Sequence, residues 1–231
     1  MGKPEFLQLL VFHLGPLHIG ATVLTTWLLM AVLVGLAWIG TRRMSVDSPS
    51  YWQSALEGTV LALQTAIEDA APGHAKRLLP FIGTLWLFIA TANLAGLVPG
   101  LRSPTGDLSL TVALALLVFL AVHWFGIRID GLRAYLRHYL SPNPILLPFH
   151  LLGEVTRTLA LAVRLFGNMM SLEMAALLVL LVAGFLAPVP LLMLHIVEAL
   201  VQAYIFGTLA LVYVAGALQS HELSTNFPRS D

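Results

Sequence analysis

Residues 161–190, LAVRLFGNMMSLEMAALLVLLVAGFLAPVP, form a long apolar run that contains a single arginine, Arg164. The run lies within an apolar segment over 145–186, and after the prolines of FLAPVP a second one follows over 189–219. A helix needs only about 20 apolar residues to cross a bilayer, and closely spaced prolines mark a turn. The stretch therefore predicts a hairpin of two long helices that are tilted or broken within the membrane.

The composition of the whole chain agrees with a membrane protein. Of its 231 residues 58% are hydrophobic and 10% charged, and the mean hydropathy is +0.86, values typical of polytopic membrane proteins. The formal net charge is zero, which gives no indication of a nucleic-acid partner. The sequence has no cysteine, so disulfides and thiolate metal sites are excluded. No cleavable signal peptide is expected at the start.

Hydropathy predicts an all-α polytopic fold in one domain, residues 1–231. The polar stretch 45–79 is too hydrophilic to span and is predicted to contain an amphipathic helix at the membrane interface. Five membrane-inserted helices are expected over 20–40, 80–99, 108–127, 145–186 and 189–219.

The basic residues predict the orientation of these spans. In a model with alternating spans, one side collects most of the Lys and Arg outside the membrane, namely Arg42, Arg43, Lys76, Arg77, Arg128, Arg133, Arg137 and Arg229. The other side holds only Lys3 and Arg102. By the positive-inside rule the N-terminus lies outside and the C-terminus in the cytoplasm.

Arg164 is the first candidate functional residue. A charge in the bilayer centre costs about 2.5–3.5 kcal/mol on insertion scales, so it indicates a functional role by default. Arg164, Asn168 and Ser171 are spaced i, i+4 and i+7 and share one helix face. Glu173, nine residues on, points to the opposite face of an ideal helix. The alternative is a structural ion pair with an acid of the hairpin: Glu154, Glu173 or Glu198.

A second polar stripe lies in the last segment. His195, Glu198 and Gln202 are spaced i, i+3 and i+7 within apolar sequence. Each can bind water or relay a proton. The alternatives are a satisfied buried histidine and, for Asn168 as for other membrane amides, a hydrogen bond that joins two helices.

These residues leave three classes of function open. The first is an ion-translocating subunit whose polar stripes line aqueous routes that meet near Arg164. The second is a secondary transporter with a substrate site at Arg164, although the inverted repeat of such transporters is not visible. The third is an intramembrane metalloenzyme, suggested by His195 and Glu198, but the sequence lacks HExxH and a second histidine at ligand spacing.

Two stretches resemble a known family. The run TRTLALAVRLFGNMMSLEM over 156–174 and the run LHIVEALVQAYIFGTLALVYV over 194–214 are similar to the a subunit of rotary F-type ATP synthases. Its signature is LRLFGNM followed downstream by Gln-Ala, an aromatic residue, Val or Ile, and Phe. The similarity extends over most of the chain through TRRM, WQSALE, PFIGTLWLFIATANLAGLVPG and DLSLT, at 41–44, 52–57, 80–100 and 107–111.

The resemblance implies roles for individual residues. Arg164 matches the stator arginine that faces the ring of c subunits. The positions that line the half-channel open to the outer side are matched by Asn168, Glu173, His195 and Gln202, and Glu198 is an additional acid beside them. Glu154 and Arg157 are candidates near the mouth of the cytoplasmic half-channel.

The resemblance also implies a cellular role. The chain is expected to be a stator subunit of a bacterial inner membrane that conducts protons or sodium ions to and from the c-ring, coupled to ATP synthesis or hydrolysis elsewhere in the complex. It is expected to hold no catalytic residue, cofactor or metal. Its implied partners are the c-ring, the b subunits of the peripheral stalk, the rest of the ATP synthase and the lipid bilayer.

Overall fold

The computed structural model describes residues 12–14, 17–42, 44, 50–98, 101, 103–131, 147–183 and 189–226. Its elements in chain order are β1 (Phe12–Leu14), β2 (Leu17–Ile19), α1 (Ala21–Thr41), α2 (Tyr51–Ala70), α3 (Ala75–Ala95), η1 (Pro104–Gly106), α4 (Leu108–Asp130), α6 (Leu147–Ala183) and α7 (Val189–Asn226). The predicted turn at Pro188 lies outside the described residues, as do six of the basic residues used for orientation: Lys3, Arg43, Arg102, Arg133, Arg137 and Arg229.

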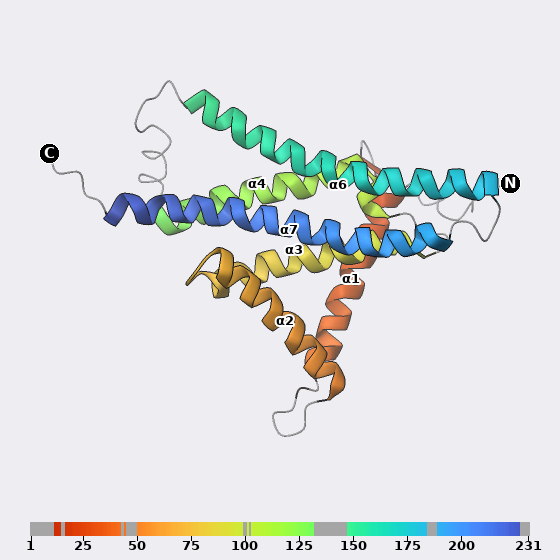
Figure 1. Ribbon diagram of the computed structural model, residues 1–231, viewed down its shortest axis with the longest axis horizontal. Coiled ribbons are helices and arrows are strands. Elements are labelled where there is room, and N and C mark those ends of the chain that lie inside the picture. The colour runs from red at the N-terminus through yellow and green to blue at the C-terminus, as the bar shows by residue number, and fades with distance from the viewer. Residues whose placement is uncertain are drawn as a thin grey trace.

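Four helices run side by side as a bundle. Helices α3, α4, α6 and α7 lie roughly along one direction in Figure 1, with α7 in contact with each of the other three. At one end of the bundle α3 and α6 begin and α4 and α7 end (Figure 1). Lys76, Arg77 and Arg128 therefore gather at this end, as the orientation argument requires.

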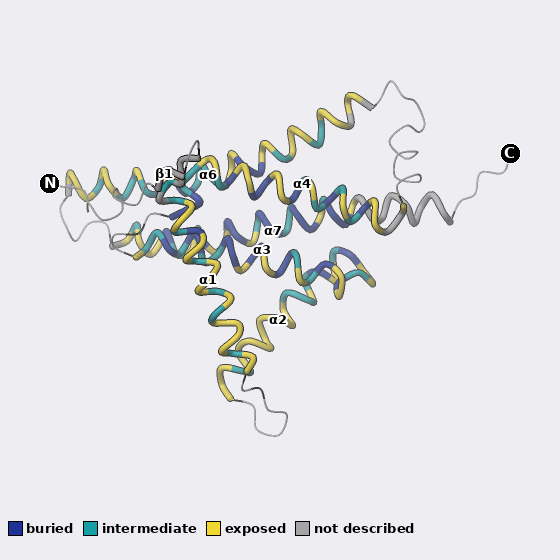
Figure 2. The backbone as a smooth tube through the Cα atoms, turned by 180° about the vertical axis from the view of Figure 1, so that it is seen from behind, coloured by how far each residue is buried: buried dark blue, intermediate teal, exposed yellow. Residues whose placement is uncertain are grey.

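The core of the bundle lies where α3 meets α7. Leu78, Ile82 and Ile89 of α3 and Phe206 and Leu211 of α7 are at most 1% exposed. Figure 2 shows the buried positions on the inward faces of these helices, whereas α1 and the outer face of α6 are mostly exposed. Apolar side chains on an outer face are what a lipid-facing surface requires.

A glycine allows one especially close contact in this core. A Cβ at Gly207 of α7 would overlap Cδ1 and Nε1 of Trp86 on α3. The Trp86 indole donates a hydrogen bond to the carbonyl of Tyr204 at 3.3 Å and stacks on the Tyr204 ring at 6.1 Å between centroids. Small residues let membrane helices approach in this way.

The prediction of five apolar spans is confirmed. Five helices are long and apolar enough to cross a membrane, over Thr22–Thr41, Ala75–Ala95, Leu108–Arg128, Leu151–Val182 and Pro190–Gly216. At 1.5 Å per residue, the 37 residues of α6 and the 38 of α7 each extend over about 55 Å. The two long helices of the hairpin are therefore as expected.

Two boundaries differ from the prediction. Helix α3 begins at Ala75 rather than at residue 80. The prediction missed the first turn because Lys76 and Arg77 lower its hydropathy without preventing a helix. Helix α7 continues to Asn226, beyond the predicted end at 219, through a polar stretch that hydropathy does not detect. The short antiparallel pair β1 and β2 near the N-terminus was not predicted.

Helix α1 leaves the bundle at a steep angle, and α2 returns toward it (Figure 1). The 21 residues of α1 extend about 31 Å, close to the thickness of the hydrocarbon core. Because α1 and the bundle cannot both follow the membrane normal, an upright α1 requires strongly tilted α6 and α7. Their excess length fits the same tilt.

Helix α2 is amphipathic, as predicted. Its apolar stripe, Trp52, Leu56, Val60, Leu63 and Ile67, is spaced by three or four residues. Acidic and amide side chains line the adjacent face, because Gln53, Glu57, Gln64 and Glu68 each directly follow a residue of the stripe. Only one end of the stripe packs on the bundle, since Ile67 is 0% and Trp52 81% exposed. The location of α2 at the membrane interface stays a prediction.

Asp107 connects α1 to the start of α4. One of its carboxylate oxygens caps α4 by accepting from the backbone N–H of Ser109 at 2.9 Å, and the other accepts from the Thr22 hydroxyl at 2.8 Å. Partial burial raises the pKa of the carboxyl, but the hydrogen bonds from Ser109 and Thr22 outweigh it and lower the pKa below 3.8. The resulting stabilisation is present above the unfolded pKa and is lost as pH falls through the folded one.

Candidate functional site

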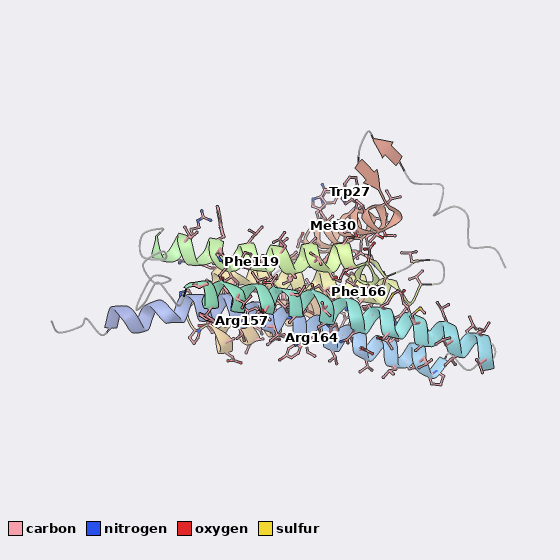
Figure 3. All side chains as sticks on the ribbon, turned by 90° about the horizontal axis from the view of Figure 1, so that it is seen from above. Trp27, Met30, Phe119, Arg157, Arg164 and Phe166 are labelled. Carbon is pink, nitrogen blue, oxygen red and sulfur yellow. The ribbon has the colours of Figure 1, made fainter. Side chains whose placement is uncertain are left out.

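Arg164 projects from the middle of α6 and is exposed on the surface of the subunit. The preceding residue, Val163, is 52% exposed, so the cation stands in an apolar outer face. Figure 3 shows Arg157 and Arg164 on the side of the bundle opposite Trp27 of α1. Within the described ranges Arg164 forms no ion pair or hydrogen bond, which contradicts the alternative of a structural pair with Glu154, Glu173 or Glu198.

One turn beyond Arg164, two amides join the long helices. Asn168 of α6 donates through Nδ2 to Oε1 of Gln202 on α7 at 2.7 Å. Gln202 is 1% exposed, and its Nε2 has no hydrogen-bond partner in the described part of the chain. A buried amide donor without a partner costs about 1–3 kcal/mol, so this nitrogen is a natural contact for a water molecule.

His195 of α7 is buried against α3 and, among the described residues, forms no hydrogen bond with Glu198 or Gln202 of the stripe predicted on its own helix. It is 6% exposed, and its Nε2 lies 3.2 Å from the carbonyl oxygen of Asn93. A carbonyl only accepts, so this contact assigns the proton to Nε2 and leaves Nδ1 as the acceptor of the neutral ring. A histidine held in one tautomer is suited to pass a proton through its free nitrogen.

A buried polar network surrounds His195, and the sequence reasoning missed it. Asn93 donates to the carbonyl of Ala199 at 3.1 Å and accepts from the Thr105 hydroxyl at 2.6 Å. Ser103 lies 2.6 Å from Thr105 and donates to the carbonyl of Ala92. One signal was visible in the sequence, since Asn93 is an amide within the apolar segment 80–99.

Glu173 and Glu198 form no hydrogen bond with this network in the described part of the chain. The Glu173 carboxylate packs on η1, with Oε1 3.3 Å from the position that a Cβ of Gly106 would take. Glu198 is partly exposed and forms no hydrogen bond or ion pair in the described part of the chain. The structure thus joins Asn168 with Gln202 and brings His195 to α3, but it does not unite His195, Glu198 and Gln202 in one cluster.

The opposite end of α6 carries a second set of ionisable groups. Oε2 of Glu154 lies 3.3 Å from Nε2 of His123 on α4. The Arg157 guanidinium lies 5.8 Å from the centroid of the Tyr213 ring on α7, within the range of a cation–π contact. In the described ranges no three His, Asp or Glu residues gather as metal ligands.

Comparison with known proteins identifies the family. The profile described as ATP synthase A chain matches residues 23–215. The chain belongs to this family. It is 68% identical over 212 residues to ATP synthase subunit a 2 of Pelobacter propionicus, covering 92% of each chain. It is 53% identical over 225 residues to ATP synthase subunit a of Legionella pneumophila, covering 97% of this chain and 98% of the other.

Membership in the ATP synthase A chain family confirms the resemblance recognised from the LAVRLFGNMM stretch. It selects the ion-translocating subunit among the three classes that the residues alone left open. The multi-pass membrane location is supported by the same relatives together with the five apolar spans.

Proposed function

We propose that this chain is the stator subunit that carries ions to and from the c-ring of an ATP synthase. The observation that carries the proposal is the position of Arg164. Its cation is exposed on an apolar outer face, without a partner among the described residues, midway along a helix of about 55 Å. Such a charge is available to a group on another chain that passes along this face.

The chemistry requires a fixed cation at this place. A carboxylate that a rotor carries through lipid must be neutral, because desolvation disfavours its charged form. Beside Arg164 the anion is favoured, so the rotor group releases its ion there. Arginine suits this role because it stays charged where a buried lysine can neutralise.

Two routes approach Arg164 from opposite ends of α6. The outer half-channel would use Asn168, Gln202, His195, Glu173 and Glu198, which extend from one turn past the arginine to η1. The unsatisfied amide of Gln202 supports water in this route. The cytoplasmic half-channel would use Glu154 and Arg157, about 15 Å and 10 Å before Arg164 along the helix.

The orientation and the partners belong to the same proposal. The ends of α3, α4 and α6 that carry Lys76, Arg77, Arg128 and Glu154 would face the cytoplasm, with the N-terminus outside and the C-terminus inside. The c-ring would pack on the face that presents Arg164. The b subunits of the peripheral stalk are proposed partners at another face.

Replacing His195 or Glu173 with leucine should slow ion translocation without uncoupling the motor. These residues would relay ions into the outer route, and losing a positioned proton-transfer group commonly costs about 100-fold or more, whereas Arg164 still separates the routes. The measurement is ATP-driven pumping in reconstituted vesicles, normalised to assembled complex, with and without sodium. Thr208→Val on α7 is the control. Normal turnover in both variants, with less complex assembled, would assign the two residues a structural role only.

Accessibility of single cysteines should reveal the orientation. The native chain has no cysteine, so each introduced thiol is unique within it. Ser103 would be a poor position because it is 4% exposed, whereas Val98, in the turn after α3, is 50% exposed. A membrane-impermeant thiol reagent should label Val98→Cys from outside and Pro72→Cys, in the exposed turn before α3, from the cytoplasm. Labelling from the reverse sides would contradict the proposed orientation.

A further inference from the structure

His123 and Glu154 form an ionisable pair that the sequence analysis did not connect. Nε2 of His123 on α4 and Oε2 of Glu154 on α6 are 3.3 Å apart, and the side chains are 26% and 21% exposed. Both residues lie within apolar spans, Leu108–Arg128 and Leu151–Val182. Ionisable groups at such positions are costly and mark ion pathways or structural pairs.

The surroundings of His123 assign its protons. Nδ1 lies 2.8 Å from the carbonyl oxygen of Phe119 one turn earlier, and a carbonyl only accepts, so Nδ1 carries the proton. The Phe119 ring, 4.3 Å away between centroids, packs against the imidazole. Nε2 is therefore the nitrogen that takes up or releases a proton, and it is the nitrogen that faces Glu154.

The tautomer differs from that of His195. His195 contacts a carbonyl through Nε2, which leaves Nδ1 as its second nitrogen, whereas His123 contacts a carbonyl through Nδ1, which leaves Nε2. Each histidine is thus oriented by a backbone carbonyl through one ring nitrogen, and the other nitrogen of His123 faces Glu154. On α6, Glu154 lies about 15 Å before Arg164 and Glu173 about 13.5 Å after it, so acids flank the cation on both sides.

We propose that His123 is a proton-relay residue of the cytoplasmic half-channel and acts together with Glu154. This inference rests on the proposed function and adds a residue of α4 to the route. The 3.3 Å contact between Nε2 and Oε2 is not aligned as a hydrogen bond, so proton transfer needs a small rotation of either side chain. After that rotation one proton would lie either on Nε2, opposite the Glu154 carboxylate, or on the carboxyl, opposite the Nε2 lone pair. A proton that enters from one side displaces this proton toward the other, and no other bond changes.

The other charged or titratable side chains described at this end of α4, α6 and α7 are Arg128, Arg157 and Tyr213. Arg128 lies 5.7 Å from the Trp124 ring centroid, and Arg157 lies over the Tyr213 ring. Neither arginine is suited to exchange protons, because the guanidinium keeps its charge in proteins. The histidine and the carboxylate are therefore the groups of this set suited to a relay near neutral pH.

The test uses whole complexes in inverted membrane vesicles. His123→Gln and Glu154→Gln should each lower pumping per assembled complex by about 100-fold or more, and His123→Gln should flatten the pH profile, because glutamine does not ionise. His74→Gln, a histidine of the turn before α3, is the matched control. Unchanged turnover and pH profile would overturn the proposal, and so would reduced assembly with normal turnover per complex, which a structural pair predicts.

A cysteine at the same position locates the residue in the route. A membrane-impermeant thiol reagent added on the side that holds Arg128 should label His123→Cys and block the remaining pumping. Labelling from the other side alone would overturn the proposal. The Arg164→Ala variant keeps the two claims separate. Coupled pumping in Arg164→Ala would contradict the proposed function. Loss of pumping in Arg164→Ala together with normal pumping in the His123 variants would contradict only the relay.

Discussion

Coupled ATP synthesis in the Arg164→Ala variant is expected to fall by about 100-fold or more, the range found when a preorganised charge stabiliser is removed. Under the proposed function, the variant would lose the cation that favours the anionic form of a passing carboxylate, and the rotor group would no longer release its ion there. Assembly should be normal, because Arg164 is exposed and contributes no hydrogen bond or ion pair within the described residues. The measurement is ATP synthesis by energised vesicles, normalised to assembled complex.

The matched control is Ser171→Ala. Ser171 lies seven residues after Arg164 on the same helix face, is also exposed, and donates its hydroxyl hydrogen bond to the Gly167 carbonyl of its own helix. Its replacement should leave synthesis unchanged. Synthesis near the native rate in Arg164→Ala at equal amounts of complex would show that the cation is not the coupling group.

Gly207→Ala is expected to destabilise the subunit by about 1–3 kcal/mol or more, the usual cost of overpacking a core. The new methyl group would overlap Cδ1 and Nε1 of the Trp86 ring, far inside van der Waals contact. The indole cannot move easily, because it is stacked on Tyr204 and hydrogen-bonded to its carbonyl. Thermal unfolding of the purified complex and the amount of subunit in the membrane report the loss.

Two further variants test this interpretation. Gly216→Ala, on the same helix, should be tolerated because no atom lies within 4 Å of the added Cβ. Combining Gly207→Ala with Trp86→Phe should be less destabilising than the sum of the two single changes, because the smaller ring makes room for the methyl group. Additive losses would show that the contact between α3 and α7 is not the cause.

The spans were predictable because each is an apolar run whose length exceeds the thickness of the bilayer. The amphipathic α2 was predicted because the stretch 45–79 is too polar to span the membrane. The start of α3 did not follow, since Lys76 and Arg77 lower the hydropathy of a turn that is helical all the same. Hydropathy measures how readily side chains transfer from water into lipid, whereas the ends of a helix depend on where its backbone hydrogen bonds begin and end.

The sequence by itself determined the membrane class, the five spans, the long hairpin and the isolation of Arg164 in an apolar face, because each depends on composition and spacing along one chain. Only the tertiary structure decided which polar groups meet. Gln202 bonds to Asn168 rather than to members of its own stripe, His195 contacts Asn93, and His123 faces Glu154. These contacts join residues 31 to 102 positions apart, and they depend on how the helices are packed and rotated, which the periodicity of a single helix does not contain.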